Sequence, residues 1–530
     1  MLTQSSGTGA RSRRWTLRER RRPAWAPVAF GAALFAGAVL CVIPALASEA
    51  GESPVELMAP AGPAGGETVV LSLSEAVKLA LENNLDLQIE RINPLLADAT
   101  IMTAESSFEP LFFLNSQASR SQRPGAVVFS DGLAYTPVNV SDSLTVGAGV
   151  RKLFATGANV RLSYDHVRSA SPPGPGSQSG VAGLTVTQPL LRDAWFEPTL
   201  RDLRLAQNDK LAVDAQLESA VLETVATVEV AYWDLVFVRQ ELDIKKRLLA
   251  LTEEFFENNK QRAEAGIIAD IEVLRSEANV ASRRAALLEA ENSVRRAEDN
   301  LRRLLRGPRL DVATTGELVP ADSPTEEGWE VDLKHALYLA LSQRPELRAA
   351  KIALESRGID VRVAKNELLP RLDLTGFYRS RGAGTSLASV YEDIDSLLFE
   401  DYGAAVSVEV PLGNRRARSE LTKAHLRELR DLLAWKRLEE NIIIEVKNLV
   451  RSVLTAHQEI AGFEAARALA SKQLEAEMTN FEVGRSTGLD VLRVQQDFAQ
   501  AETDKLQAVV SYNRLMAELR RATASYPFAR

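Results

Sequence analysis

The sequence predicts a mainly α-helical chain of two structural repeats, with a smaller membrane β-barrel portion to which both repeats contribute strands. Three observations favour this fold class. They are an internal repeat, two very long helical stretches, and short patches in which apolar and polar residues alternate.

The internal repeat divides the chain into two halves. Residues 71–87 (LSLSEAVKLALENNLDL) align with residues 331–347 (VDLKHALYLALSQRPEL) at an offset of 260. Residues 265–275 (AGIIADIEVLR) align with residues 483–493 (VGRSTGLDVLR) at an offset of 218. A Gly-Pro pair and a Pro/Thr/Glu-rich stretch then predict a linker between the halves. The predicted organisation is a signal peptide (1–47), a flexible linker (48–70), a first repeat (71–306), an inter-repeat equatorial linker (307–330), a second repeat (331–524) and a C-terminal tail (525–530).

Each half is expected to contain a short helix, a second helix, strand patches, a very long helix, a glycine-bearing break and a returning helix. At 1.5 Å per residue, the long helices would be about 90 to 100 Å long, which exceeds the size of a globular domain. The expected helices are 74–83, 85–106 and 198–260 in the first half, and 332–343, 346–366 and 416–482 in the second.

Apolar residues in the first long helix recur every three or four positions, with an average near 3.5. This is the seam period of coiled-coil packing, and an ordinary buried helix of this length would not fit one small domain. The seam positions are Leu217, Val221, Val225, Val228, Tyr232, Leu235, Val238 and Leu242.

Alternating segments predict strands between the second helix and the long helix of each half. Alternation alone favours a half-buried strand in a soluble sheet, whereas the exported, cysteine-free and helix-dominated context favours strands that cross a membrane. Their length of about seven to ten residues is close to what a tilted strand needs to cross the hydrocarbon layer. The clearest apolar positions are Phe112, Leu114 and Ala118; Ala182, Leu184 and Val186; and Tyr402, Ala404, Val406, Val408 and Val410, with a further patch at 371–379.

An additional hairpin is indicated in the first half. Residues 144–151 and 158–165 also alternate, with Thr156 and Gly157 in the turn between them. The hairpin either stands above the membrane or adds two strands per copy to the barrel, and the sequence leaves both alternatives open.

The amino end has the layout of a signal peptide. Seven arginines precede an apolar stretch at 24–46, and Ala45 and Ala47 occupy the positions that a signal peptidase reads. We expect cleavage after Ala47, and a membrane-anchoring helix is the alternative. Cleavage would remove Cys41, the only cysteine, so disulfide and thiol chemistry are not expected. It would also remove seven arginines and one glutamate, which changes the net charge from −8 to −14.

The composition argues against several function classes. An acidic chain is a poor match for nucleic acid, whose phosphates need an excess of Lys and Arg. After the signal peptide no uninterrupted apolar run reaches 18 residues, so membrane insertion would need strands closed into a barrel. No nucleophile–base pair, phosphate loop or metal set is recognisable, so neither catalysis nor a cofactor is expected. The four histidines are scattered without metal-ligand spacing: His166, His335, His425 and His457.

On these residues the chain resembles the TolC-like outer-membrane efflux proteins, the outer membrane factors of tripartite efflux and type I secretion systems. The resemblance covers about residues 70–524. It rests on the two repeat openings, the strand exits VTQPLL and VEVPLG, and the turn FEVGRSTGLDVLRVQQDFAQAE. It implies a homotrimer in which each protomer gives four strands to one transmembrane β-barrel and its helices to one hollow periplasmic α-barrel. Oligomerisation is also required physically, because four strands cannot close a barrel around a pore.

The resemblance also implies a location and partners. The protein is expected in the bacterial outer membrane, in contact with its lipid and extending into the periplasm. The expected partners are a periplasmic adaptor (membrane fusion) protein and an inner-membrane pump.

By resemblance, candidate pore residues lie beyond the glycine-bearing breaks. Glu272 and Asp490 each follow a break glycine by six residues, where acidic residues of the family line the narrow periplasmic mouth. In a trimer they would form acidic rings that favour cations. The alternative is helix capping, since the dipole stabilises a carboxylate in the first turn, and the two roles are compatible. Arg275 and Arg493 depart from the family's acidic pattern and would partly neutralise such a ring.

The same turns, 263–272 and 481–490, are expected to dock the adaptor. A tight reversal between antiparallel helices favours glycine because it needs φ > 0. The family carries an aromatic and a basic latch residue here, although its basic position aligns with Ser486. The candidate docking residues are Gly266, Phe481, Gly484, Arg485 and Leu489.

The sequence therefore predicts a passive exit duct for drugs, metals or proteins, driven by an inner-membrane pump. A non-conducting coiled-coil spacer across the periplasm is the alternative. The strand patches argue against the spacer, which has no use for them.

Overall fold

The computed structural model describes residues 68–130, 133–136, 138–171, 176–306, 310, 316–328 and 331–526. They belong to one compact unit, Pro63–Arg530. The expected signal peptide and its cleavage site lie outside the described residues, as do most of the expected linker at 48–70 and the last four residues of the tail.

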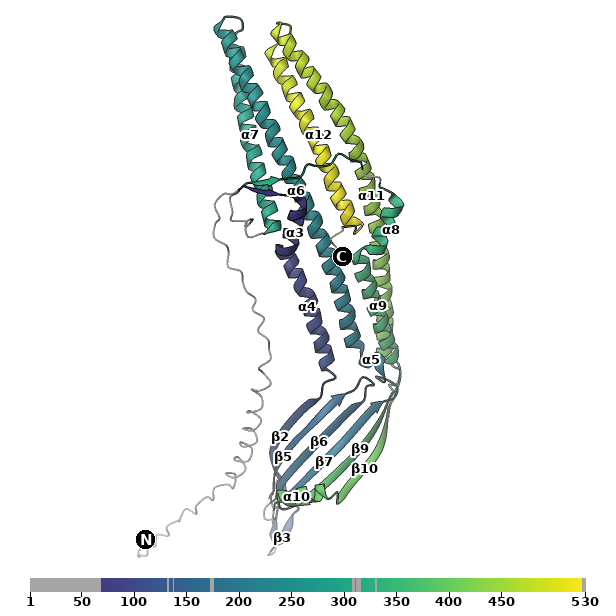
Figure 1. The fold of residues 1–530 in the computed structure, drawn as a ribbon. Helices are drawn as coiled ribbons and strands as arrows, with labels where there is room; N and C mark the ends of the chain where they lie inside the picture. The colour runs from purple at the N-terminus through teal and green to yellow at the C-terminus, as the bar shows by residue number, and fades with distance from the viewer. Residues whose placement is uncertain are drawn as a thin grey trace, which may run out of the picture. The chain divides into compact units, whose positions relative to one another are not determined.

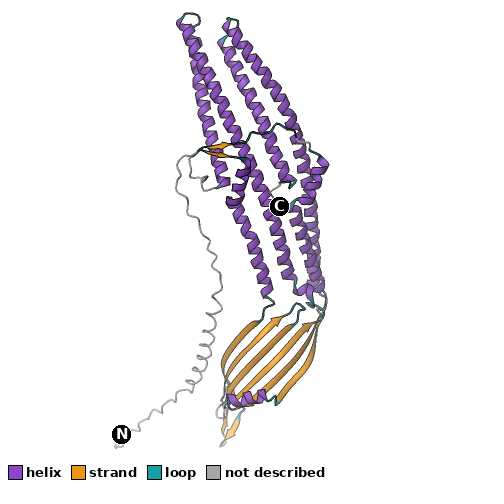
Figure 2. Cartoon of the chain, viewed as in Figure 1, coloured by secondary structure: helices purple, strands orange, loops and turns teal. Residues whose placement is uncertain are grey.

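Four longer helices follow one another in the same order in each half of the chain, while α5 and α10 occupy different places, α5 after the last strand of the first half and α10 between two strands of the second (Figure 1; Figure 2). The predicted helix ranges are confirmed to within a few residues, and α10 has no counterpart among the predicted elements. The helices of the first half are α3 (Leu73–Asn83), α4 (Leu85–Ser106), the short α5 (Phe196–Thr199), α6 (Arg201–Glu264) and α7 (Asp270–Leu305). The helices of the second half are α8 (Leu333–Gln343), α9 (Pro345–Asn366), α10 (Leu387–Asp395), α11 (Arg415–Glu482) and α12 (Gly488–Ala522).

The joint between the first two helices has the same backbone geometry in each half. Asn84 and Arg344 each form a single-residue joint with φ −61° and ψ 123°. Asn84 caps α4 by accepting a hydrogen bond from Leu87 N (3.1 Å), whereas Arg344 is buried and pairs with Glu445 at 2.7 Å. The same joint is therefore stabilised by different side chains in the two halves.

The two long helices run through both helical layers. In the layer next to the sheet, α6 contacts α4 and α9, and α9 contacts α11; farther from the sheet, α6 contacts α7 and α12, and α12 contacts α11 (Figure 1). The predicted seam of α6 is confirmed, since its four central positions are buried and its four outer positions are half-buried. Separate cores form around Tyr232 on α6 and Tyr512 on α12. Within the described ranges, none of the helices has the length and apolar character needed to span a membrane.

Two segments expected to be linkers contribute a small parallel sheet. β1 (Val69–Leu71) pairs with β8 (Leu318–Pro320). The hydroxyl of Tyr232 on α6 lies within hydrogen-bond distance of Leu71 O (3.1 Å) and Asp322 Oδ2 (3.0 Å), which fixes this sheet to the helices. Strands of three residues are too short to show alternation in a sequence. Part of the expected tail is also packed, because Tyr526 is buried.

The longer strands form one antiparallel six-stranded sheet with the order β10-β9-β7-β6-β5-β2. The additional hairpin indicated by the sequence is β5–β6, and it lies between β2 and β7 in the same ladder. The strands are β2 (Leu111–Pro124), β5 (Val138–Leu153), β6 (Asn159–Ala170), β7 (Ser177–Pro189), β9 (Arg371–Gly384) and β10 (Phe399–Glu409). A separate short hairpin of β3 (Val128–Ser130) and β4 (Leu133–Tyr135) follows β2.

The two faces of the six-stranded sheet differ in chemistry. Directly opposed residues of antiparallel strands lie on the same face, so the register assigns every residue to a face. One face, here called the apolar face, carries predicted apolar positions such as Leu184 and Val406, which are exposed. The other, here called the polar face, carries residues such as Asn115, Thr185 and Ser407.

The helix α10 lies across the apolar face at the end of the sheet far from the long helices (Figure 1). Gly180 and Gly382 oppose each other in the register, and their lack of side chains lets the helix backbone approach the sheet. A Cβ on Gly382 would clash with Val390 O, and Val390 is fully buried in this contact.

Candidate pore mouth and docking surface

The two glycine-bearing breaks have the same backbone geometry. Gly266 and Gly484 follow α6 and α11 with φ of +75° and +74°, in the left-handed region. The amide after each glycine donates to a carbonyl of the last helical turn, at 2.9 Å for Ile267 and 2.8 Å for Arg485. Among the described residues, only chain neighbours lie within 4 Å of a Cβ built on either glycine. The backbone conformation, and not crowding, therefore requires glycine here.

Asp490 caps the returning helix of the second repeat. Thr487 is the N-cap of α12, and its Oγ1 accepts from Asp490 N while Asp490 Oδ2 accepts from Thr487 N, both at 3.3 Å. The Thr487 hydroxyl's own donation to Oδ2, the bond from the Thr487 amide to the same oxygen and the nearby charge of Arg493 lower the pKa of Asp490 below its ordinary value. The carboxylate is therefore charged and exposed while it stabilises the start of the helix.

Glu272 has different contacts. It lies in the first turn of α7, but the N-cap residue is Ala269, whose methyl group cannot take part in a capping box. Arg275 binds Glu272 instead, with 2.6 Å between Nη1 and Oε1. A Cβ on Gly488 would lie 3.7 Å from Glu272 Oε2, so this carboxylate also lies beside the first residue of α12. The two predicted acidic positions are thus unequal, since Asp490 is a cap and Glu272 is an ion-pair partner near two helix amino termini.

Phe481 joins the two helical hairpins. Its ring packs against Phe255 of α6, with 5.2 Å between ring centroids. Val491 and Leu492 at the start of α12 complete this cluster, here called the tip cluster. The guanidinium of Arg262 lies over the Phe481 ring, 4.8 Å from its centroid. The breaks of the two repeats, far apart in sequence, are therefore held side by side.

The cation beside Phe481 is not the one that the family pattern suggested. Arg262 of α6 covers the ring, whereas Arg485 is exposed in the turn. Ser486, at the family's basic position, donates a hydrogen bond to Glu477. The aromatic and cationic groups thus meet across two hairpins and not within one turn.

Phe255 is a site residue that the sequence patterns did not single out. Beyond the predicted seam, α6 has a further buried stripe with intervals of three or four residues. This stripe begins two residues after Leu242, so the seam extended at its own period reaches Phe256 and does not single out Phe255. The positions of the stripe are Ile244, Leu248, Thr252, Phe255 and Asn259.

Exposed apolar side chains surround both turns. Leu489, Ile267, Ile271 and Val483 are each more than half exposed. A groove of 430 Å³ opens between the hairpins beside them, with Phe481 in its lining. Exposed apolar groups around a groove are typical of a protein-binding surface.

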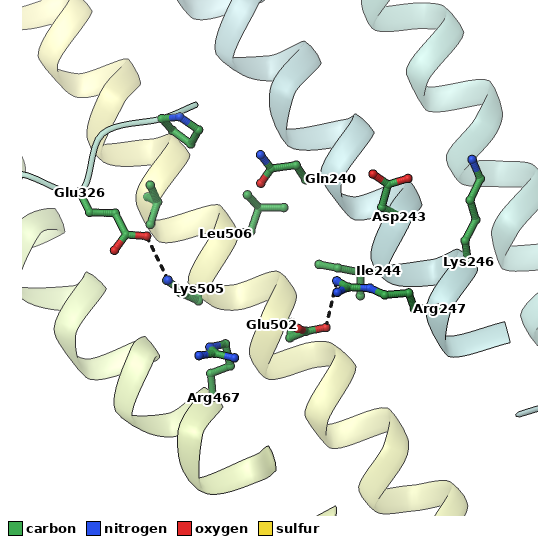
Figure 3. A pocket seen from close by; sticks show the side chains of 12 residues that line it. Gln240, Asp243, Ile244, Lys246, Arg247, Glu326, Arg467, Glu502, Lys505 and Leu506 are labelled. Atoms are coloured by element: carbon green, nitrogen blue, oxygen red, sulfur yellow. Dashed lines mark hydrogen bonds and ion pairs between the residues drawn. The ribbon is translucent and has the colours of Figure 1, made fainter. Parts of the chain in front are cut away.

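A larger cavity of 710 Å³ lies where α6, α11 and α12 meet the 316–328 segment (Figure 3). Lys505 pairs with Glu326 and Glu464, both at 3.0 Å, and Arg467 pairs with Glu464 at 2.7 Å. Hydrogen bonds from Arg467 and Lys505 lower the pKa of Glu464 to about 2. The network ties the segment between the repeats to the long helices, which is a structural role.

The histidines lie in unrelated places. His166 contacts Tyr164 in the sheet (3.3 Å), and His425 contacts Glu428 on α11 (3.5 Å). The described part of the chain contains no group of three or more His, Cys, Asp or Glu that could hold a metal ion.

Known proteins share this sequence pattern and fold. The family described as "Outer membrane efflux protein" matches residues 76–307 and 336–525. The outer membrane efflux protein BepC of Brucella suis is 24% identical over 367 residues, which cover 67% of this chain and 75% of the relative. The outer membrane protein TolC of Vibrio cholerae is 25% identical over 369 residues, which cover 69% of this chain and 81% of the relative.

Among solved structures, the Campylobacter jejuni CmeC outer membrane channel has a TM-score of 0.63 at 17% identity, with 85% of each chain covered. At this identity the likeness shows the fold. The family match is broader evidence of kinship, because it spans most of both repeats. The chain therefore belongs to the outer membrane efflux protein family, whose members are channels of the bacterial outer membrane that extend into the periplasm.

Proposed function

We propose that three copies of this chain close into a ring that forms a passive exit duct across the periplasm and the outer membrane. An inner-membrane pump drives export through a periplasmic adaptor, and the exported solutes are drugs, metals or proteins. The observation that carries the proposal is a sheet with one apolar and one polar face. The outer strands of this sheet lie on the same two sides as the outer helices of the adjoining helical layer.

The sheet and the helices next to it have open edges on the same two sides. Within the described residues, β2 and β10 are the outer strands of the sheet. In the neighbouring helical layer, α4 and α11 are the outer helices. An unpaired strand edge is a template for another chain. Head-to-tail repetition would pair β10 and α11 of one copy with β2 and α4 of the next, and such contacts close into a ring.

Both outer helices expose apolar stripes at matching heights. α4 leads into β2 and α11 follows β10, so residues equally far from the sheet lie at about the same level. When residues are counted from the end of each helix that adjoins the sheet, Leu96 is level with Leu426, and Ile92 is level with Leu429. The stripes are Ile89, Ile92 and Leu96 on α4 and Leu426, Leu429 and Leu433 on α11, all more than half exposed.

Paired cysteines test the ring, because the natural Cys41 lies in the predicted signal peptide. Oxidation of the Leu96→Cys/Leu426→Cys variant should give a covalent trimer, whereas each single variant should run as a monomer on denaturing gels. The ring is contradicted if this variant and Ile92→Cys/Leu429→Cys both remain monomeric after oxidation and after treatment with a short bifunctional linker.

At the free ends of the hairpins, acidic side chains are assigned to the pore mouth. Glu272 and Asp490 would each form a ring under three-fold symmetry. Arg275 already binds Glu272, so the Glu272 ring is partly neutralised, and Arg493 has a weaker effect on Asp490. The exposed and charged Asp490 is therefore the main candidate for cation preference, and it keeps its capping role.

The surface around the two turns is assigned to the adaptor. Gly266 and Gly484 set the conformation of the turns. Phe481 and the groove provide an apolar contact surface, and Arg485 and Leu489 are exposed beside it. An adaptor that presents apolar side chains to this groove would hold both hairpins of one copy together.

A non-conducting spacer across the periplasm is the second candidate. A spacer would need the long helices and their seam, but not a sheet with an exposed apolar face opposite a polar one. The sheet therefore favours the duct.

A further inference from the structure

The apolar face of the sheet runs without a gap through the additional hairpin. From β2 to β10, direct cross-strand partners form one row of apolar or aromatic side chains, each more than a third exposed. Two members of the row, Val150 and Leu162, belong to β5 and β6. The row is Phe112, Val150, Leu162, Leu184, Tyr378 and Tyr402.

The polar face is also continuous through the hairpin. One residue farther along the strands, Gly149 and Ser163 of the hairpin are direct partners, and Gly183 of β7 and Arg379 of β9 follow in the same row. The hairpin thus alternates in step with the strands on both sides of it. A hairpin standing in water would gain nothing from an exposed apolar face in this register.

Charged side chains bound the apolar segment of β5. Asp142 and Lys152 lie on its apolar face, and Asp142 pairs with Arg120 of β2 at 3.5 Å. Lys152 lies 5.4 Å from the ring centroid of Phe154, at the end of the strand near the helices. Nine residues lie between the two charges along the chain, and a tilted transmembrane strand has about 9–11 residues. β5 is therefore long enough to cross the hydrocarbon layer.

The turn of the hairpin is built into the helix side of the sheet. Thr156 O accepts hydrogen bonds from Trp195 N and from Gln188 Nε2, both at 3.0 Å. Gly157 has φ +84°, and a Cβ on it would lie 2.8 Å from Asp193 O. These partners connect β7 to α5, so the turn is fixed where the other strands meet the helices.

We propose that all six strands of each copy cross the outer membrane, so that the ring closes an eighteen-stranded barrel in place of the twelve-stranded barrel that the family resemblance implies. This proposal rests on the proposed ring of three. Strands about 4.8 Å apart and tilted by about 40° give a backbone radius of about 18 Å for eighteen strands and about 12 Å for twelve. The eighteen-stranded barrel then has about twice the cross-section of a twelve-stranded one. It admits bulky solutes, and only the helical tips select solutes by size.

Adjacent single cysteines in β6 test the membrane crossing. Leu162→Cys lies on the apolar face and Ser163→Cys lies on the polar face, while Leu184→Cys and Thr185→Cys are the matched pair in β7. With the protein in the outer membrane, a membrane-impermeant maleimide should label each polar-face cysteine at least tenfold faster than its apolar-face neighbour, in both strands.

The possible results separate this inference from the proposed function. Equal labelling at the β6 pair, with alternation kept at the β7 pair, would place the hairpin in water and overturn the eighteen-stranded barrel while the duct stands. Loss of alternation at both pairs would mean that the sheet does not cross the membrane, which overturns both.

Polymer exclusion measures the width directly. In planar bilayers, polyethylene glycols added on the side of the barrel should enter up to a radius of about 13 Å, which is the backbone radius less about 5 Å for side chains. A cut-off near 7 Å would match twelve strands and contradict the proposal.

Discussion

Truncating Phe255 to alanine should loosen the contact between the two hairpins. Phe255 is 7% exposed, and it packs against Phe481, Val491 and Leu492 in the tip cluster. Truncation of a buried phenylalanine costs about 3–5 kcal/mol. The low end applies here because the cluster is small and lies close to the ends of the hairpins. About 0.5–1.5 kcal/mol of the cost is the lost aromatic pair.

A loss of about 3 kcal/mol should make local opening of the tips roughly a hundredfold more frequent. Hydrogen exchange of the purified protein, followed by mass spectrometry, reports this as faster exchange in peptides covering 255–270 and 481–492. Phe256→Ala is the control, because Phe256 is the next residue on α6 and only half-buried. Exchange within about threefold of the parent protein, or equal acceleration by both variants, would refute the reasoning.

Three further predictions follow from the same region and from the Glu464 network. The pKa of Glu464 is about 2 in the folded chain, below its ordinary 4.5, so its stabilising contribution is present above pH 4.5 and is lost as the pH falls from about 4.5 to about 2. The Glu464→Gln variant should therefore lose less stability than the parent protein when the pH falls through this range, as measured by thermal unfolding. Equal losses in the two proteins would contradict a stabilising role of the network. Gly484→Arg should abolish export by cells that carry the cognate pump while the trimer still assembles, because it strains a φ of +74° and fills the docking surface; unimpaired export would remove this turn from the docking surface. Thr487→Ala should remove the cap of α12 at a cost of about 1 kcal/mol, seen as roughly fivefold faster amide exchange in its first turn, whereas Thr487→Ser should exchange like the parent.

The helical scaffold could be predicted because its signals are periodic and local. The seam of α6 repeats often enough to separate it from a single buried helix, and the predicted end of α11 at Glu482 is the observed one. Ser72 and Glu75 form a capping box that the LSLSEAV sequence shows directly. Such signals depend on neighbours within one or two turns, so one sequence is enough to read them.

The pairing of the strands could not be predicted as well from the sequence. Alternation gives a strand its two faces but does not name its partners, so the hairpin at 144–165 could be recognised without being placed. Its place depends on contacts such as that between Thr156 and Trp195, which no local pattern encodes. The seat of α10 on Gly180 and Gly382 likewise depends on two strands that are distant in sequence.

In the candidate site, too, local features could be predicted from the sequence and contacts between distant segments could not. The glycines of the breaks could be predicted because a helical reversal needs positive φ, and the Thr487–Asp490 spacing makes the cap readable. The contact between Phe255 and Phe481 could not be predicted, because it joins two hairpins that lie in different repeats. The pairing of Glu272 with Arg275 could be anticipated from their spacing of three on one helix.

Single-channel conductance of the purified trimer in planar bilayers is the most direct test of the duct. We expect a small, mostly closed conductance with a preference for cations. Asp490→Ala should reduce that preference, and Glu289→Ala, an equal charge change on the exposed surface of α7 away from the tips, should leave it unchanged. Conductance without a selectivity change would leave Asp490 as a helix cap alone. A folded trimer that never conducts would contradict the duct and support the spacer.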